Sequence, residues 1–178
     1  MHRLELQALA ELRITEANAL LVAGFPAGAY YLAGYSVELA VKAIIAKRFE
    51  EHTIPEKNLV REYYTGHSVE NLLKLAKLQG AFQERQKNPD FSRNWSIVKN
   101  WSTDARYKID QETFIAHNPA QKLQSLFRGD TQAIAHDPAQ KLQSLSLLLG
   151  LTQSHAQVLL EAITSEENGI LSWLKTFW

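Results

Sequence analysis

The chain has 178 residues, of which 46% are hydrophobic and 21% are charged, a balance that excludes intrinsic disorder and fits one folded domain over 1–178. Its 19 basic and 19 acidic residues cancel, so no overall charge attracts nucleic acid or an anionic membrane, and a polyanion would need a local basic patch. The absence of Cys excludes disulfides, cysteine-ligated zinc and thiol nucleophiles.

Two long helices are predicted in the N-terminal part. Residues 4–23 carry apolar side chains at intervals of three and four, and Gly24 follows as a C-cap. The pattern restarts over 27–51, where a wide apolar face and several small residues predict a helix that a neighbour approaches closely. Within it Glu38 and Lys42 stand one turn apart, in the favourable order for an ion pair.

The central part is predicted as a loop followed by shorter helices. Residues 52–66 hold a proline, a glycine and several charges and are predicted as a loop. A short helix is predicted over 68–79, and residues 81–88 continue as helix until Asn88-Pro89 breaks it. Ser92 is then the predicted N-cap of the next helix. The inward side of that helix carries Trp95, Val98, Trp101 and Ala105.

The last third contains a repeat. Residues 116–126 recur as 135–145, with a period of 19 residues and ten of eleven positions identical. Each copy has the residues of a helix start, so we interpret 111–152 as a duplicated helical insertion. A last helix is predicted from about residue 154 to Trp178. Its inward residues begin with Val158, Leu159, Ala162 and Ile163.

No segment alternates apolar and polar residues at strand spacing, so the predicted class is all-α. The expected architecture is an up-and-down bundle of four to five long helices with an extra helical insertion. The N-terminal residues lack the apolar block of a signal peptide, and no apolar run approaches the roughly 20 residues of a membrane helix. We therefore expect a cytoplasmic protein with no membrane contact.

Four segments, in the same order, resemble the HEPN (higher eukaryotes and prokaryotes nucleotide-binding) family of helical bundles. The string AYYLAGYSVELAVKAIIAKRF, Ala29 to Phe49, is similar to the family's second helix, where an aromatic stretch leads into a Glu-x-x-x-Lys pair, here Glu38 and Lys42. The second segment is Gly66-His67-Ser68, which precedes a leucine-rich helix as in the family. The third is 104–107, which ends in the Ala-Arg-Tyr that closes the fourth helix of many members, and the fourth is the C-terminal segment 162–178. The resemblance covers 4–110 and 155–178 and excludes the repeat.

The family's ribonucleases act as dimers and use an Arg-x4–6-His motif, in which Arg holds a phosphate and His moves a proton. Arg93-Asn94 stands where that motif begins, but the next six residues, Trp95 to Asn100, include no His. The resemblance thus implies a protein of the bacterial defence or toxin–antitoxin kind that lacks the usual nuclease motif. It would bind RNA, a nucleotide or a partner protein. A homodimer is expected, and the implied partners include a nucleotidyltransferase or an antitoxin.

Five residues are candidates for a ligand or cleft site. Arg61 and His67 satisfy the spacing of the nuclease motif, but in the predicted loop. Either His67 caps or packs at a helix start, or His67, Arg61 and Arg106 converge on an anion near a helix N-terminus. Glu38 and Lys42 form either a structural pair or a polar element of a cleft. The alternative functions are a metal-independent endoribonuclease with displaced catalytic residues, weakly assigned to Arg61 and His67, and a purely structural interaction protein.

No metal or cofactor is expected. His117 and His136 both precede Asn/Asp-Pro, but duplication copies a His whether or not it is used, and no third ligand recurs at ligand spacing. The glycines form neither a P-loop nor a dinucleotide fingerprint. The four Trp residues, Trp95, Trp101, Trp173 and Trp178, are predicted in the core or an interface rather than as stacking platforms for bases.

Overall fold

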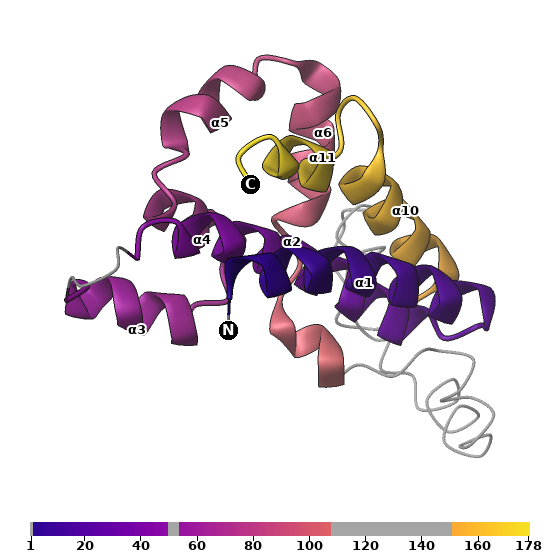
Figure 1. The fold of residues 1–178 in the computed structure, drawn as a ribbon. Coiled ribbons are helices and arrows are strands. Elements are labelled where there is room, and N and C mark those ends of the chain that lie inside the picture. Colours follow the sequence, from indigo (N-terminus) through magenta and orange to yellow (C-terminus); the bar gives the residue numbers. More distant parts are fainter. Residues whose placement is uncertain (1, 50–53, 108–150) are drawn as a thin grey trace, which may run out of the picture.

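The computed structural model describes residues 2–49, 54–107 and 151–178, and every regular element in these ranges is a helix (Figure 1). The helices are α1 (Arg3–Val22), α2 (Pro26–Ala46), α3 (Lys57–Thr65), α4 (Val69–Leu75), α5 (Gln79–Arg85), α6 (Pro89–Val98), the 3-10 helix η1 (Thr103–Tyr107), α10 (Gln153–Thr164) and α11 (Ile170–Lys175). The all-α class is therefore confirmed. Within these ranges, none of the helices has the length and apolar character that crossing a membrane requires.

A tight turn sets α1 and α2 antiparallel to each other (Figure 1). Gly24 adopts a left-handed φ of 82°, which glycine accepts without a Cβ clash. The N–H of Phe25 donates to the carbonyl of Leu20 at 2.8 Å and that of Gly24 to Leu21 at 3.2 Å, so two of the four carbonyls in the last turn are satisfied by the turn itself. Pro26 then occupies the first position of α2, where its missing N–H costs nothing.

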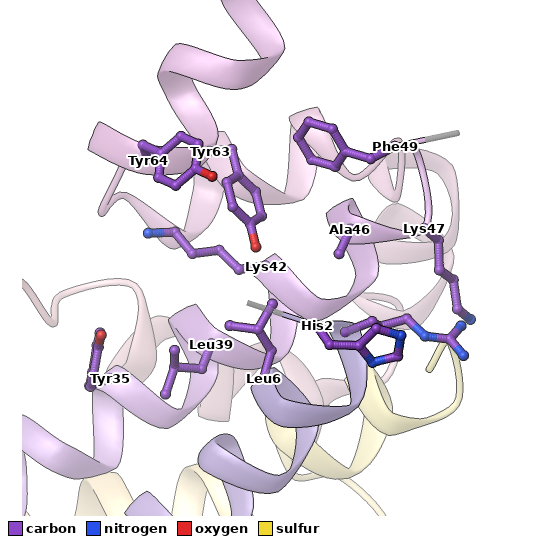
Figure 2. Close-up of a pocket in the computed structure, with 11 residues that line it drawn as sticks. His2, Leu6, Tyr35, Leu39, Lys42, Ala46, Lys47, Phe49, Tyr63 and Tyr64 are labelled. Carbon is purple, nitrogen blue, oxygen red and sulfur yellow. The ribbon is translucent and has the colours of Figure 1, made fainter. Parts of the chain in front are cut away.

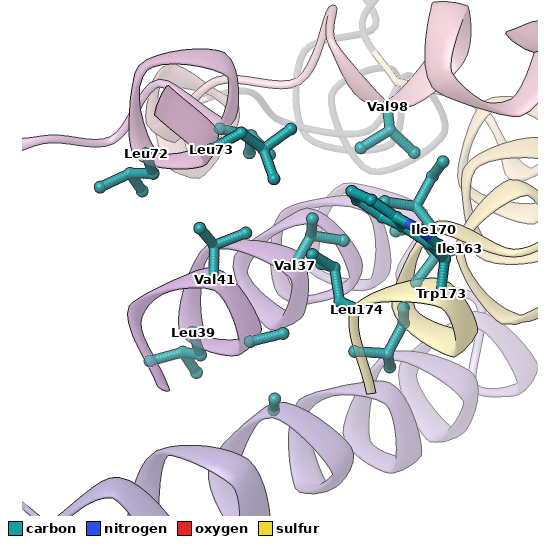
Figure 3. Close-up of a cluster of buried hydrophobic side chains, with 14 of the residues drawn as sticks. Val37, Leu39, Val41, Leu72, Leu73, Val98, Ile163, Ile170, Trp173 and Leu174 are labelled. Atoms are coloured by element: carbon teal, nitrogen blue, oxygen red, sulfur yellow. The ribbon is translucent and has the colours of Figure 1, made fainter. Parts of the chain in front are cut away.

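Helix α2 is the centre of the molecule, because it packs against α1, α4, α10, α11 and η1. This arrangement explains the wide apolar face in its sequence, since neighbours cover it on several sides. Figure 3 shows Val37 and Val41 of α2 directed at a cluster of apolar side chains from the neighbouring helices. Those labelled in the cluster are Leu72 and Leu73 of α4, Val98 of α6, Ile163 of α10, and Ile170, Trp173 and Leu174 of α11.

Trp101 packs against the backbone of α2 at Gly34. A Cβ built on Gly34 would overlap the indole ring, so the glycine is required by this close approach. The ring also stacks on Tyr31, with centroids 6.3 Å apart. Trp101 is buried, as are Trp95 and Trp173, which confirms the prediction that these three lie in the core.

Two sequence predictions about the central elements are wrong. Part of the predicted loop 52–66 is the nine-residue helix α3, which forms because burial of Leu59 stabilises it. The N-cap of α6 is Asn88 rather than Ser92: its side chain accepts from the N–H groups of Asp90 and Phe91. Pro89 is the first residue of α6, and the preceding helix α5 ends before it at Arg85, as the predicted break requires.

The C-terminal region also differs from its prediction. The single helix expected from residue 154 to Trp178 is two helices, α10 and α11, separated by the segment 165–169. Val158 is exposed, while the other three residues predicted inward with it are buried. The repeat at 116–126 and 135–145 lies outside the described residues.

Because Trp101 lies against the backbone at Gly34, adding one methyl group at this position should lower the stability of the protein. Gly34→Ala should lower the free energy of unfolding by about 1–3 kcal/mol, because the indole must move in a packed core. Gly80→Ala in α5 is the matched control, since a Cβ there meets no atom within 4 Å. The control should leave stability unchanged or raise it by up to about 1 kcal/mol. Urea denaturation of both variants measures the difference, and equal stabilities would contradict this packing.

Candidate functional site

Three of the candidate residues, Glu38, Lys42 and His67, meet in one cluster. The carboxylate of Glu38 is buried, with only 1% of the side chain exposed. The ammonium of Lys42 donates to Glu38 Oε1 at 2.8 Å. The Nδ1 atom of His67 lies 3.1 Å from Glu38 Oε1 and 3.2 Å from Oε2. A buried carboxylate is stable only with such partners, and these two satisfy both of its oxygens.

The link between α3 and α4 positions His67. Gly66 ends α3 where a Cβ would overlap the carbonyl of Glu62, and Ser68 begins α4 by accepting from the N–H of Asn71 at 3.4 Å. The one residue between these two caps is His67. An ionised carboxylate only accepts hydrogen bonds, so this contact requires the hydrogen on Nδ1 and leaves Nε2 for other partners. The His67 side chain is 46% exposed.

The other predicted site residues lie elsewhere in contacts of their own. Arg61 pairs with its neighbour Glu62 at 3.3 Å, and both side chains are exposed to solvent. The guanidinium of Arg106 stacks on the ring of Tyr107, 4.8 Å from its centroid. Neither arginine joins Glu38 in an ion pair. Among the described residues, no hydrogen bond or ion pair links Arg61 or Arg106 to His67.

Arg93 and Asn94, where the nuclease motif would begin, have structural partners. Arg93 forms an exposed ion pair with Asp90 at 2.8 Å. The amide of Asn94 donates to the carbonyl of Asn168 at 2.9 Å, which ties α6 to the segment before α11. His117 and His136 lie outside the described residues.

A groove of about 670 Å³ opens beside the Glu38 cluster, between the start of α1, the C-terminal half of α2 and α3 (Figure 2). We call it the cationic groove. Its lining residues are His2, Arg3, Leu6, Tyr35, Leu39, Lys42, Ala46, Lys47, Phe49, Tyr63 and Tyr64. Lys42 belongs to both features, because its ammonium binds the buried carboxylate while its side chain forms part of the wall.

The described lining residues of the groove carry a positive charge. Its formally charged lining side chains are Arg3, Lys42 and Lys47, and none of the described lining residues is Asp or Glu. Burial raises the pKa of Tyr35, and the negative charge of nearby Glu38 adds to that rise, while Arg13 opposes it. Burial also raises the pKa of Tyr63. Both hydroxyls therefore stay neutral near pH 7, and the wall presents cations and neutral hydrogen-bonding groups.

Aromatic side chains gather where α3 covers the groove. Phe49 and Tyr63 meet edge to face with centroids 5.2 Å apart, and Tyr63 meets Tyr64 in the same way, also at 5.2 Å. Tyr64 is 72% exposed, so one face of its ring is open to a planar ligand. The arrangement can hold an anion and an aromatic group at the same time.

Most of the groove was missed by sequence reasoning. Arg3, Lys47 and Tyr64 come from three segments, and no motif connects them. The one available signal was the spacing of Leu59 and Tyr63, four residues apart, which fits one face of a short helix.

Comparisons with protein-family models, curated proteins and solved structures find no match for this chain. The resemblance to HEPN domains accordingly stays a prediction. Among the described residues, no three His, Asp or Glu side chains come together in a way that could hold a metal ion.

The buried pair predicts a strong energetic coupling. In a double-mutant cycle of Glu38→Ala and Lys42→Ala, we expect a coupling free energy of about 1–3 kcal/mol, because either single change leaves a charge in the core without its partner. Glu70 and Lys74 provide the matched cycle, with the same spacing but exposed side chains 3.8 Å apart. Their coupling should stay below about 0.5 kcal/mol. Urea denaturation gives both values, and similar couplings would show that Glu38 is solvated.

Proposed function

We propose that this protein is a nucleotide- or RNA-binding module whose ligand lies in the cationic groove. The observation that carries the proposal is the combination of Arg3 and Lys47 with the open ring of Tyr64 along one groove. A nucleotide has the two matching parts, a phosphate for the cations and a base for the ring. A volume of about 670 Å³ lies within the range of small-molecule sites.

The resemblance to HEPN domains supports the same proposal from the sequence. It adds an up-and-down bundle of the HEPN type, a homodimer, and a role in bacterial defence or a toxin–antitoxin pair with a nucleotidyltransferase or antitoxin partner. In this proposal the protein binds without catalysis, because Arg93 and Asn94 are engaged by Asp90 and Asn168 and no His completes the motif.

The test compares two double variants with the same change in charge. Arg3→Ala/Lys47→Ala removes the cations of the groove, and Lys87→Ala/Lys99→Ala removes two exposed lysines outside its lining. By fluorescence anisotropy at about 0.1 M salt, the groove variant should bind a labelled single-stranded hexaribonucleotide at least tenfold more weakly, and the control should bind like the parent.

The salt dependence of the affinity shows whether weaker binding results from lost phosphate contacts or from a change in the fold. Each phosphate contact to a single strand contributes roughly 0.7 to the slope of log affinity against log salt, so the slope should fall by about 1.4 in the groove variant. Equal losses in the two variants would reject the groove as the site. No binding of RNA or nucleotide by the parent would favour a purely structural interaction protein.

A second candidate function is metal-independent RNA cleavage. The observation that favours it is the contact of His67 Nδ1 with the buried Glu38, since a carboxylate that fixes a histidine leaves Nε2 able to accept a proton. Arg61, the other weak candidate, forms an exposed pair with Glu62 rather than with Glu38.

Cleavage of the hexaribonucleotide in EDTA by the parent, abolished in His67→Ala and strongly reduced in Glu38→Gln, would establish this function. His155→Ala is the matched control, because this His caps α10 far along the chain from the cluster. The non-catalytic proposal predicts intact RNA in every sample.

A further inference from the structure

We infer that the cationic groove selects the terminal phosphate monoester of a nucleotide, which it binds in preference to the phosphodiesters inside a strand. This inference rests on the proposed function and adds the chemical class of the ligand. The selectivity depends on the cations of the groove: one is paired with a carboxylate of the protein, and two have no such partner among the described residues.

Of the three formal cations in the lining, one is neutralised within the protein. The ammonium of Lys42 lies 2.8 Å from Glu38 Oε1, and only 12% of the Lys42 side chain is exposed. An ammonium held by a buried carboxylate contributes little net field to the groove, because the two opposite charges form a short dipole. Lys42 therefore shapes the wall more than it attracts an anion.

Among the described residues, Arg3 and Lys47 form no ion pair with a carboxylate, so within that part of the chain their charges are not balanced. The ammonium of Lys47 donates one hydrogen bond to the carbonyl of Phe177, a neutral acceptor that fixes its position and leaves two hydrogens for an anion. The nearby Glu5 carboxylate accepts the N–H of His2 at 2.8 Å and does not line the groove.

The start of α1 lies at this end of the groove. His2 and Arg3 both line the groove, and the Glu5 carboxylate of the first turn offsets part of the helix dipole there, so the side chain of Arg3 supplies the available charge. Figure 2 shows Lys47 and His2 toward one end of the groove and Tyr64 toward the other. A single nucleotide would thus lie with its phosphate at the α1 end and its base at α3.

Two available cations match a dianion. A phosphate monoester has a second pKa near 6 and carries about −1.5 to −2 at neutral pH, whereas a phosphodiester carries one negative charge. Bound monoester therefore leaves Arg3 and Lys47 balanced, and bound diester leaves one of them without a counter-charge. The groove should therefore bind a phosphate monoester more tightly than a phosphodiester. The base is held by stacking in both ligands, so it does not contribute to the difference.

The test uses ligands that differ in that one charge. Isothermal titration compares AMP with adenosine 5′-(methyl phosphate), which keeps the base, the sugar and the phosphorus but is a diester. We expect AMP to bind at least tenfold more tightly at about 0.1 M salt, and the Arg3→Ala/Lys47→Ala variant to lose most of that preference. Lys87→Ala/Lys99→Ala should keep it.

A hexaribonucleotide with and without a 5′-phosphate distinguishes the source of the monoester. A preference for the 5′-phosphorylated strand assigns the groove to RNA ends, and a preference shown only with AMP assigns it to free mononucleotides. Either result supports the inference. If monoester and diester bind equally but binding still depends on Arg3 and Lys47, the inference is overturned while the proposed function stands. If no ligand binds, the proposed function itself fails.

Discussion

The carboxylate of Glu38 lies in the core, and an ionised carboxylate in such a place needs partners that remain fixed. Its partners come from two different parts of the chain. Lys42 lies one turn further along α2, and His67 lies in the link between α3 and α4. Glu38 therefore ties the start of α4 to the middle of α2, and α3, which immediately precedes that link, lines the groove together with α2 through Tyr63 and Tyr64. The position of the groove follows from this tie.

A second constraint acts one turn earlier in α2. The small residues along this helix allow close contact, most clearly at Gly34, where the indole of Trp101 lies against the backbone. Helix α2 thus has small residues where its neighbours approach closely. It also has a buried ion pair where the link between α3 and α4 is held. The C-terminal end of α2 is fixed as well, since Arg48 donates to the carbonyl of Leu75 in α4 and Lys47 donates to that of Phe177. These contacts hold the C-terminal end of α2, which forms one wall of the groove.

The long elements could be predicted from sequence because their apolar periodicity extends over five turns or more, as in α1 and α2. Short elements could not. Helix α3 is only nine residues long, so its helical spacing is confined to the pairs Leu59/Tyr63 and Val60/Tyr64. Pro89 follows the end of α5 and is also the first residue of α6, and Asn88 rather than Ser92 caps that helix. Glu38, Lys42 and His67 were identified one by one, but that His67 contacts Glu38 is a tertiary fact with no local signal. The same holds for Arg3 and Lys47, whose neighbours in sequence do not predict a shared groove.

The most direct test of the account is the hydrogen position on the ring of His67, measured by long-range ¹H–¹⁵N NMR at neutral pH. If Glu38 is an ionised acceptor that organises this region, Nδ1 carries a hydrogen in the parent protein, and this preference weakens in Glu38→Gln. His155 provides an internal reference, because its Nδ1 contacts the Thr152 hydroxyl rather than a carboxylate. An unprotonated Nδ1 on His67, or the same spectrum in Glu38→Gln, would show that Glu38 does not hold His67, and the proposed origin of the groove would be wrong.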